Sequence, residues 1–299
     1  MKNNIQFNRF YKVFNFISLA LVIISVLLIF FKGLNFGVDF KGGTLIELRV
    51  NDKQTNISSL RSAFNSMNLG DVAIKNFGNE NDYLIKFEKK DKDKNLIQNI
   101  KKELTKKIGP VYEFRRVENV GPKVSAELLN KGLIAIAVAL GAMLFYIWIR
   151  FEWQFSIGAI IALFHDVIIT IGIFSLFSIE INLSIVAAVL TIVGYSMNDT
   201  VVIFDRVREN LKKHISIKIF ELTNISINET LSRTIITSVT TLLALLSIFI
   251  FGGEILKGFS LAMILGVIFG TYSSIYIANT VLVRLRVSQK TVLREDDKK

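Results

Sequence analysis

The sequence predicts a polytopic α-helical membrane protein that has six transmembrane helices and one small α+β domain of the ferredoxin-like type. The first observation is that 51% of the 299 residues are hydrophobic and gather in long blocks between charged stretches. A helix needs about 20 consecutive apolar residues to cross a bilayer, and six blocks approach or exceed this length. The second observation is that short amphipathic elements replace the long blocks between the first two of them, which indicates a folded, water-soluble domain.

The boundaries of the six predicted spans lie where each apolar block meets charged residues. The spans cover residues 13–31, 132–149, 155–177, 183–204, 235–252 and 258–283. The first block follows Lys2, Arg9 and Lys12, as a secretory signal would, but its apolar run is too long and no small-residue cleavage site follows. We therefore expect this block to remain as the first span.

The positions of Lys and Arg in the short loops predict the orientation, because cytoplasmic loops retain positive charge. Basic residues gather before the first span, after the second and fourth spans, and in the tail, so both termini are expected in the cytoplasm. The net charge of +11 is explained by these segments and by anionic lipid, and it does not indicate a nucleic-acid partner. The expected parts are the N-terminus and first span (1–31), a periplasmic domain with its linker (32–131), the other five spans (132–283) with a cytoplasmic loop at 205–234, and a basic cytoplasmic tail (284–299).

The order of elements in the predicted domain is β-α-β-β-α-β. A first strand alternates apolar and polar residues at 46–50, strands at 72–77 and 83–88 flank a glycine-containing connection at 78–82, and a last strand covers 111–117. Two helices are marked by apolar residues at helical spacing, namely Ile57, Leu60, Phe64 and Met67, then Ile97, Ile100, Leu104 and Ile108. This is the split βαβ arrangement, with both helices on one face of a four-stranded antiparallel sheet.

Asp199 and Arg233 lie in or beside the predicted spans, where an ionisable side chain costs about 2.5 to 3.5 kcal/mol on insertion scales. Asp199 comes six residues before Asp205, where the fourth span is expected to end, about 9 Å along the helix. Ser226 and Glu229 form a capping-box pattern that predicts the start of the fifth helix, and Arg233 follows this cap by seven residues, about 10 Å. Their equal depth allows Asp199 and Arg233 to meet.

Polar residues extend the faces that carry these two charges. Tyr195 precedes Asp199 by four residues, and Thr237 follows Arg233 by four residues. One interpretation is a proton relay, in which movement of Arg233 toggles the protonation of Asp199. The other interpretation is a static ion pair that joins two helices.

Other polar residues in the spans also have both functional and architectural interpretations. His165 and Asp166 are adjacent near the middle of the third span, and because adjacent helical residues do not share a face, one of them is expected to face the bundle or a partner. Each is either a proton carrier or a hydrogen-bonding residue of the bundle. Asn198 is interpreted as a residue that joins helices by a hydrogen bond. Small residues at steps of four predict close helix packing at Ala262, Gly266, Gly270 and Ser274.

Four segments, taken together and in order, resemble the signature segments of the SecF family. The first is GVDFKGG at 37–43, where Gly37, Gly42 and Gly43, with Asp39 among them, permit a tight turn into the first strand. The others are AAVLTIVGYSMNDTVVIFDRVREN at 187–210, RTIITSVTTLLALLSIFIFGG at 233–253 and GFSLAMILGVIFGTYSSIY at 258–276. The resemblance covers residues 14–283.

The resemblance implies half of a twelve-helix core of the resistance-nodulation-division type, which pairs with SecD, the larger homologue. It implies a subunit of the SecDF complex in the bacterial cytoplasmic (inner) membrane, where the complex assists Sec-dependent export of unfolded polypeptide through the SecYEG channel. YajC and YidC are further partners of this kind. The proton motive force would drive the process, with protons as the coupling ion and no other cofactor. Asp199 and Arg233 occupy the positions of the proposed proton pathway of the family.

Two other functions are compatible with six spans and one exported domain. A small-molecule efflux pump of the same superfamily needs large exported domains to enclose its substrate, and residues 32–131 are few for that purpose. A passive scaffold that only stabilises partners leaves Asp199 and Arg233 without a use. The sequence shows no nucleotide-binding loop, metal-ligand cluster or nucleophile with its base, so neither an enzyme nor a metal site is expected.

Overall fold

The computed structural model of the chain describes residues 5–51, 57–67, 69–70, 72–87, 95–110, 112–214 and 216–292. It separates into two compact units, one made of Met1–Asn35 and Ile134–Lys299 and the other of Phe36–Leu133. We call the first the helical unit and the second the α+β unit. Residues 293–299 of the predicted tail and residues 1–4 lie outside the described residues.

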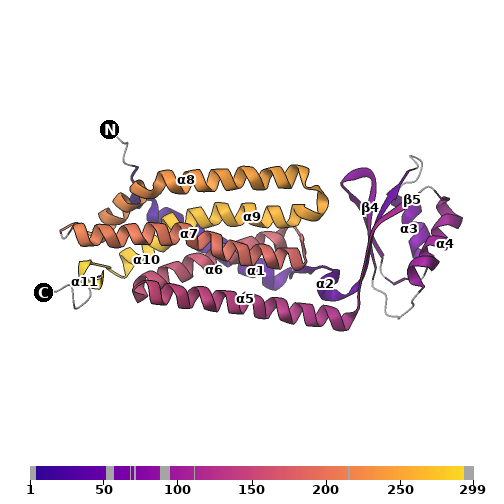
Figure 1. Cartoon of the computed structure of the whole chain (residues 1–299), viewed down its shortest axis with the longest axis horizontal. Coiled ribbons are helices and arrows are strands. Elements are labelled where there is room, and N and C mark those ends of the chain that lie inside the picture. The colour runs from indigo at the N-terminus through magenta and orange to yellow at the C-terminus, as the bar shows by residue number, and fades with distance from the viewer. Residues whose placement is uncertain are drawn as a thin grey trace. The chain divides into compact units, whose positions relative to one another are not determined.

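The described residues include six helical segments long and apolar enough to cross a membrane, as predicted, and these run lengthwise in Figure 1. They are η1 (Phe7–Phe10) with α1 (Tyr11–Phe31), α5 (Pro122–Arg150), α6 (Trp153–Leu176), α7 (Leu183–Lys213), α8 (Ile219–Phe251), and α9 (Gly253–Ser273) with a π-helical turn, η2 (Ser274–Ala278), and α10 (Asn279–Arg284). A short helix, α11 (Gln289–Val292), and two short strands, β1 (Asn35–Phe36) and β6 (Glu180–Ile181), complete this part of the chain.

Helices α7 and α8 are longer than the predicted fourth and fifth spans. The prediction of a loop at 205–234 is wrong, because α7 continues to Lys213 and α8 begins at Ile219. The polar residues beyond the apolar blocks stay helical since they pair across the two helices. Arg206 donates to Glu229 at 2.6 Å, and Asn210 donates to Ser226 at 3.0 Å. The connection is therefore confined to residues 214–218.

The prediction that the fifth helix begins at the capping-box pattern is also wrong. Ser226 lies inside α8, where its hydroxyl donates to the carbonyl of Leu222 at 2.9 Å. Glu229 accepts hydrogen bonds from α7 and does not turn back to cap its own helix. In this chain the S-x-x-E pattern serves the contact between two helices.

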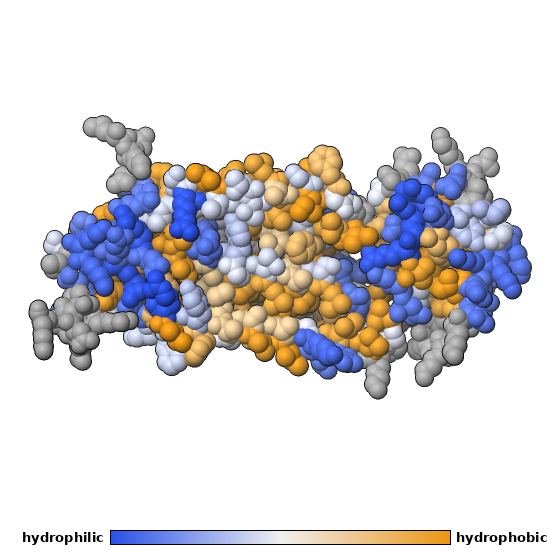
Figure 2. Space-filling view, in the orientation of Figure 1, coloured by the Kyte–Doolittle hydropathy of each residue, from blue (hydrophilic) through white to orange (hydrophobic). Residues whose placement is uncertain are grey.

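The centre of the helical unit is formed by α6, α7 and the last span. In these three, 56%, 50% and 56% of the most apolar stretch is buried, against 11% for the first and second spans and 17% for α8. Phe155 on α6 and Phe204 on α7 are fully buried and pack edge to face, with ring centroids 5.2 Å apart. Figure 2 shows apolar side chains over the middle of the helices and hydrophilic ones where α10 and the C-terminal part of α7 lie. Large uncovered apolar faces on α5 and α8 are expected of helices that contact lipid or another membrane subunit.

The α+β unit has the predicted ferredoxin-like topology. Its four strands form one antiparallel sheet in the order β3-β4-β2-β5, and α3 and α4 lie together on one side of it (Figure 1). The elements are α2 (Val38–Lys41), β2 (Gly43–Val50), α3 (Ile57–Asn65), β3 (Val72–Phe77), β4 (Asn79–Phe87), α4 (Leu96–Ile108) and β5 (Tyr112–Val120). The apolar residues at helical spacing face the sheet, where Leu60, Phe64 and Leu104 are fully buried.

The connection between the two middle strands is shorter than predicted. Gly78 alone, with a φ of 79°, separates β3 from β4, so the predicted connection at 78–82 is wrong. The polar residues there belong to β4, because the face of the sheet away from the helices carries charged pairs. One such pair joins Arg49 on β2 to Asp82 on β4 at 2.6 Å. The predicted strand ends at residues 88 and 111 lie outside the described residues.

Candidate functional site

Asp199 lies in the interior of the helical unit, midway along α7. The residue is 3% exposed, and it precedes the end of the helix at Lys213 by 14 residues, about 21 Å. The predicted depth of about 9 Å refers to the end of the apolar block at Asp205, and α7 continues past that residue. A carboxyl group thus lies deep among apolar helices.

The surroundings of Asp199 offer few hydrogen-bond donors. The hydroxyl of Thr271 on α9 donates to Oδ2 of Asp199 over a long distance of 3.5 Å. Ser238 on α8 lies next to them, with its hydroxyl 2.7 Å from that of Thr271. A buried carboxylate with so few donors is poorly compensated for the water that it has lost.

Arg233 lies as far along α8 from the α7–α8 turn as Asp199 lies along α7 from the same turn. It follows the start of α8 at Ile219 by 14 residues, about 21 Å. Its side chain is exposed at the surface of the helical unit. The charge of Arg233 reaches Asp199 electrostatically, but within the described part of the chain no ion pair of 4.0 Å or less joins them. The two charges therefore share a level in the bundle without direct contact, and a static ion pair is not formed in this arrangement.

The face of α8 that packs toward Asp199 differs from the predicted polar face. Thr234 and Ser238 are buried, whereas Thr237 is half-buried. Thr237 donates to the carbonyls of Arg233 and Thr234 on its own helix, so it does not extend a polar stripe into the bundle. A step of one residue turns a helix by about 100°, and this offset separates the buried polar residues of α8 from the exposed Arg233.

Tyr195 and Asn198 lie on α7 without contacting Asp199. The hydroxyl of Tyr195 is enclosed and has no hydrogen-bond partner among the described residues. Asn198 is exposed and forms no side-chain hydrogen bond within the described chain, so a role in joining helices would require another subunit. Gly194 lies on the same outward side, where nothing approaches within 4 Å of the position of a Cβ atom. This side of α7 is uncovered.

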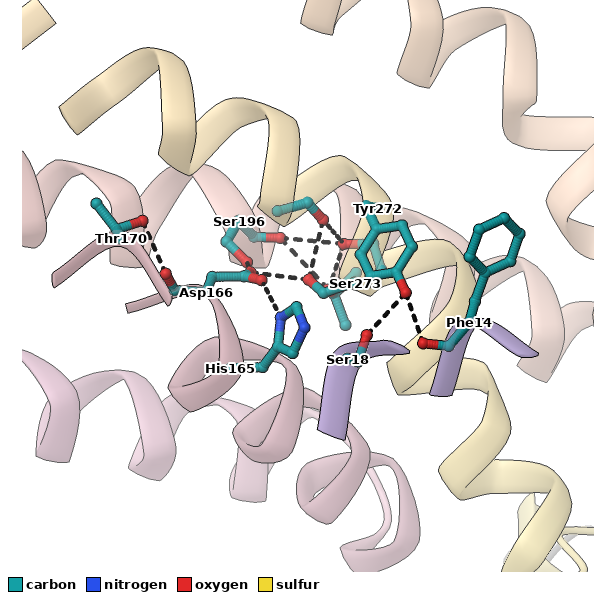
Figure 3. Close-up of polar contacts among 11 residues, drawn as sticks. Phe14, Ser18, His165, Asp166, Thr170, Ser196, Tyr272 and Ser273 are labelled. Carbon is teal, nitrogen blue, oxygen red and sulfur yellow. Dashed lines mark hydrogen bonds and ion pairs between the residues drawn. The ribbon is translucent and has the colours of Figure 1, made fainter. Parts of the chain in front are cut away.

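A second polar cluster surrounds Asp166 on α6 (Figure 3). Its Oδ1 lies 2.8 Å from Nδ1 of His165, and its Oδ2 accepts hydrogen bonds from Ser196 on α7 at 2.6 Å and from Ser273 on α9 at 2.8 Å. Asp166 is fully buried and His165 is 5% exposed. Asp166 faces the bundle, as expected of one of the two, and His165 is buried as well because the two side chains turn toward each other.

The ridge of small residues on α9 faces α7. A Cβ atom at Gly266 would lie 2.3 Å from Cγ1 of Ile192, and one at Gly270 would lie 3.1 Å from the backbone of Ser196. The two helices approach this closely only because α9 lacks side chains at these points. The ends of the ridge are Ala262, which is fully buried, and Ser274, whose hydroxyl lies 2.7 Å from that of Thr200.

The GVDFKGG segment combines one helical turn with a left-handed bend. The helical turn is α2, with Asp39 in its first turn. Gly42 and Gly43 have φ values of 80° and 125°, which favour glycine, whereas Gly37 has an ordinary extended backbone. Two of the three glycines are therefore required by the backbone where the chain enters β2.

Two protein families match the chain. The family described as "Protein export membrane protein SecD/SecF, C-terminal" matches residues 100–288, which include Asp166, Asp199 and Arg233. The family described as "SecD/SecF GG Motif" matches residues 27–53, which include GVDFKGG. Together they cover both the candidate site and the bend before β2.

Relatives with curated names match along nearly the whole chain. The protein translocase subunit SecF of Rickettsia bellii (strain OSU 85-389) is 45% identical over 284 residues, which are 94% of this chain and 93% of the relative. The protein translocase subunit SecF of Calditerrivibrio nitroreducens is 46% identical over 295 residues, 96% of each chain.

Two solved structures have the same fold. SecDF from Thermus thermophilus, described as a translocon-associated membrane protein, matches with a TM-score of 0.83 and 34% identity over 95% of this chain and 39% of that chain. SecDF in a super-membrane-facing form matches with a TM-score of 0.70 and 33% identity, at the same coverage. The chain thus spans about two fifths of the SecDF chains that it resembles. From its family matches and its relatives, this multi-pass membrane protein belongs to the SecD/SecF family of protein export membrane proteins.

Proposed function

We propose that the chain is the SecF-type subunit of a SecDF complex that uses the proton motive force to assist Sec-dependent protein export, with Asp199 and Arg233 handling the coupling proton. The relatives named protein translocase subunit SecF and the translocon-associated SecDF structure support the export role. The chain would act in transport, with the proton as its coupling ion, and we propose neither a catalysed reaction nor another cofactor.

The observation that carries the proton role is the environment of Asp199. Its carboxyl group is buried midway along α7, has only the hydroxyls of Thr271, at 3.5 Å, and Ser238 as donors among the described residues, and has no ion-pair partner there. A carboxyl group that is held this weakly can exist in both protonation states without breaking a strong network. Each proton that crosses about 100 mV releases roughly 2.3 kcal/mol, which is the energy available for moving the α+β unit.

The exposure of Arg233 supports pairing with a second membrane half. A guanidinium group that faced lipid at this depth would cost about 2.5 to 3.5 kcal/mol or more. Asn198 and Gly194 on α7 are uncovered as well, and so is one face of α8. A SecD-type half that covers these helices would shield Arg233 and Asn198, and would complete the twelve-helix core that the fold family implies.

The proposed placement follows from the basic segments and from the relatives. We assign the chain to the bacterial cytoplasmic membrane, with both termini and the α7–α8 turn in the cytoplasm and the α+β unit in the periplasm. The wider partners in this proposal are the SecYEG channel and the unfolded polypeptide in transit, with YajC and YidC as accessory proteins. The edge strands β3 and β5 offer free backbone groups for an extended polypeptide.

The direct test is the Asp199→Asn variant, because the amide keeps the shape and hydrogen bonding of the carboxyl group but cannot take up and release a proton. Precursor export into inverted membrane vesicles is measured with and without a proton gradient, and the yield of the complex with SecD is measured in parallel. We expect the stimulation by the gradient to be lost, with an unchanged yield of the complex.

The matched control is Asp205→Asn, which changes a carboxylate on the same helix. Asp205 is 42% exposed and pairs with Arg150 at 2.8 Å near the end of the bundle, so its loss should leave the stimulation intact. Normal gradient-stimulated export by Asp199→Asn would refute the proton role of Asp199. Loss of the complex in this variant would instead favour the interpretation that Asp199 only holds the helices together.

A further inference from the structure

The cluster around Asp166 contains a polar atom that the described structure leaves unused. Nδ1 of His165 is engaged with Asp166, but Nε2 of the same ring is enclosed and has no hydrogen-bond partner in the described chain. A buried ring nitrogen without a partner loses the hydrogen bond that it makes in water. His165 therefore presents one nitrogen without a partner in the described chain, among the polar side chains that Figure 3 shows.

Few charged or titratable groups surround His165 and Asp166. Asp166 accepts hydrogen bonds from Ser196 and Ser273, and it accepts a third from His165 when Nδ1 carries the ring proton. No Lys or Arg from α1, α7 or α9 contacts the pair among the described residues. The titratable groups that face it are the phenol of Tyr272, whose ring stacks on His165 with centroids 5.9 Å apart, and Tyr276 beyond it. The pair thus has a net charge of −1 when it holds one proton and 0 when it holds two.

A file of polar side chains leads from His165 toward one end of the helical unit. This polar file consists of Ser18, Asn15 and Tyr11 on α1, which are three and four residues apart, and each of them forms a hydrogen bond to another helix. Ser18 lies 2.7 Å from the hydroxyl of Tyr272, Asn15 donates to Thr280 at 2.8 Å, and Tyr11 donates to Thr223 at 3.2 Å. Thr223 lies near the start of α8, close to the turn between α7 and α8. The file therefore runs toward the end of the unit where that turn lies.

The opposite direction along α1 is closed by tight packing. Gly172 on α6 meets Ser25 on α1 so closely that a Cβ atom at Gly172 would lie 2.3 Å from Cβ of Ser25. Beyond this contact, Ser175 donates to the carbonyls of Leu28 and Gly33. Polar contacts of α1 thus follow His165 toward one end of the unit, whereas the helices pack tightly toward the other.

We propose that His165 and Asp166 form a second proton-binding site of the helical unit, in which the proton binds Nε2 of His165, Asp166 is the counter-ion, and exchange occurs along the polar file of α1. On binding, one N–H bond forms at Nε2 and one O–H bond of the delivering hydronium breaks, so the net charge of the pair changes from −1 to 0. The use of this proton in export rests on the proposed function, whereas its binding does not.

The position of the pair connects it to Asp199 through α9. Ser273 donates to Asp166, and Thr271, two residues earlier and so on nearly the opposite side of the same helix, donates to Asp199. The π-helical turn η2 begins at the next residue, Ser274. Such turns are common at functional sites of helices. A change in how Asp166 holds Ser273 would therefore be felt by the segment that contacts Asp199.

The histidine content of the chain allows a direct measurement. His165 and the exposed His214 are the two histidines of the sequence, so His214→Gln gives a chain with a single histidine. The full chain is purified in detergent with ¹⁵N-labelled histidine, and the ring nitrogen signals are followed by NMR from acid to alkaline pH. We expect Nε2 to gain a proton as the pH falls, while Nδ1 stays protonated.

A second variant tests the counter-ion. In the single-histidine background, Asp166→Asn should lower the midpoint of the His165 titration by about 1 pH unit or more, because the imidazolium loses its negative partner. Asp205→Asn, far from the pair, should leave the midpoint unchanged. Should Asp166→Asn fail to fold, Ser196→Ala retains the carboxylate and removes one of its donors, so the pair should bind the proton more tightly and the midpoint should rise.

Two results would overturn the proposal. The first is a ring whose nitrogens keep one protonation state across the whole range, which would make His165 a packing residue. The second is a titration that is the same with and without the carboxylate of Asp166. Neither result depends on export, so the inference can fail while the role of Asp199 stands, and the titration can be present in a chain whose Asp199→Asn variant exports normally.

Discussion

The two buried carboxyl groups of the helical unit differ in how firmly they are held. Asp166 engages three partners within 2.8 Å, on its own and on two other helices, whereas the hydrogen bond that Asp199 accepts from Thr271 is 3.5 Å long. Hydrogen bonds to charged groups contribute about 1.5 to 3 kcal/mol each when they are well formed. Asp166 is therefore fixed in place, and Asp199 is free to change its partner.

Substitutions of Arg233 separate its charge from its shape. Arg233→Lys keeps the positive charge but loses the planar fork, whereas Arg233→Met keeps most of the length and loses the charge. Because Arg233 acts on Asp199 through its charge rather than through a direct bond, we expect Arg233→Lys to retain part of the gradient-stimulated export and Arg233→Met to lose it. Export into inverted vesicles measures this, with complex yield as the control. Equal losses for both variants would show that the fork itself is needed.

At the scale of single residues, the sequence indicates the charged members of the site but not their neighbours. Asp199 stands out because it is ionisable in an apolar block, and that argument needs no structure. Thr271 and Ser273 give no comparable signal, since Thr and Ser are common in membrane helices and bond to their own backbone. The contact between His165 and Asp166 depends on side-chain rotation, which helical spacing does not determine. The exposure of Arg233 depends on which side of α8 faces the bundle.

Among the helices, α7 has two faces with different roles. Toward α9 it meets the ridge of small residues, and away from it lie Gly194 and Asn198, which the chain leaves uncovered. One helix can therefore hold its own subunit together on one side and receive a partner on the other. Glycine substitutions can separate the two faces.

We expect Gly266→Leu to destabilise the chain itself, because its Cβ would overlap Ile192 and overpacking costs about 1 to 3 kcal/mol. Gly194→Leu is the matched variant on the uncovered side, and it should leave the stability of the isolated chain unchanged while reducing recovery with SecD. Thermal unfolding in detergent and co-purification measure the two effects. The assignment of the faces would be wrong if both variants behaved alike.

The lengths of α7 and α8 show a limit of hydropathy at the scale of elements. An apolar block indicates where a helix crosses a membrane, but a helix that continues into water has no block to mark it. The polar residues from Asp205 to Arg233 are typical of a loop in composition. They stay helical because pairs such as Arg206 with Glu229 join the two helices, and such pairing is a tertiary contact that neither helix reveals alone. The six spans and the order of strands were predictable because each carries its own period.

At the scale of the whole molecule, the α+β unit should be an independent folding unit. It has its own buried core, with Ile46, Leu48, Phe64 and Leu104 among its fully buried residues. A fragment of residues 36–133 should show a cooperative thermal transition by circular dichroism. The fragment extends to the boundary of the unit, because β5 continues to Val120 and the hydroxyl of Ser125 donates to the carbonyl of Val38.

A core variant checks that this transition reports the native fold. Leu48→Ala removes a fully buried side chain and should lower the free energy of unfolding by about 2 to 5 kcal/mol. Val117→Ala on β5 changes a side chain that is 39% exposed and should shift it by no more than about 0.5 kcal/mol. A fragment that stays soluble but unfolds without a transition would contradict the independence of the unit.

The two arms of the α7–α8 hairpin are of equal length, since Asp199 and Arg233 each lie 14 residues from their end of it. Each residue added to one arm would move everything beyond it by 1.5 Å and turn it by about 100°. We therefore expect related sequences to lack insertions or deletions that are confined to one arm, and to change length in both arms together. The hairpin in this way keeps Asp199 and Arg233 at the same level.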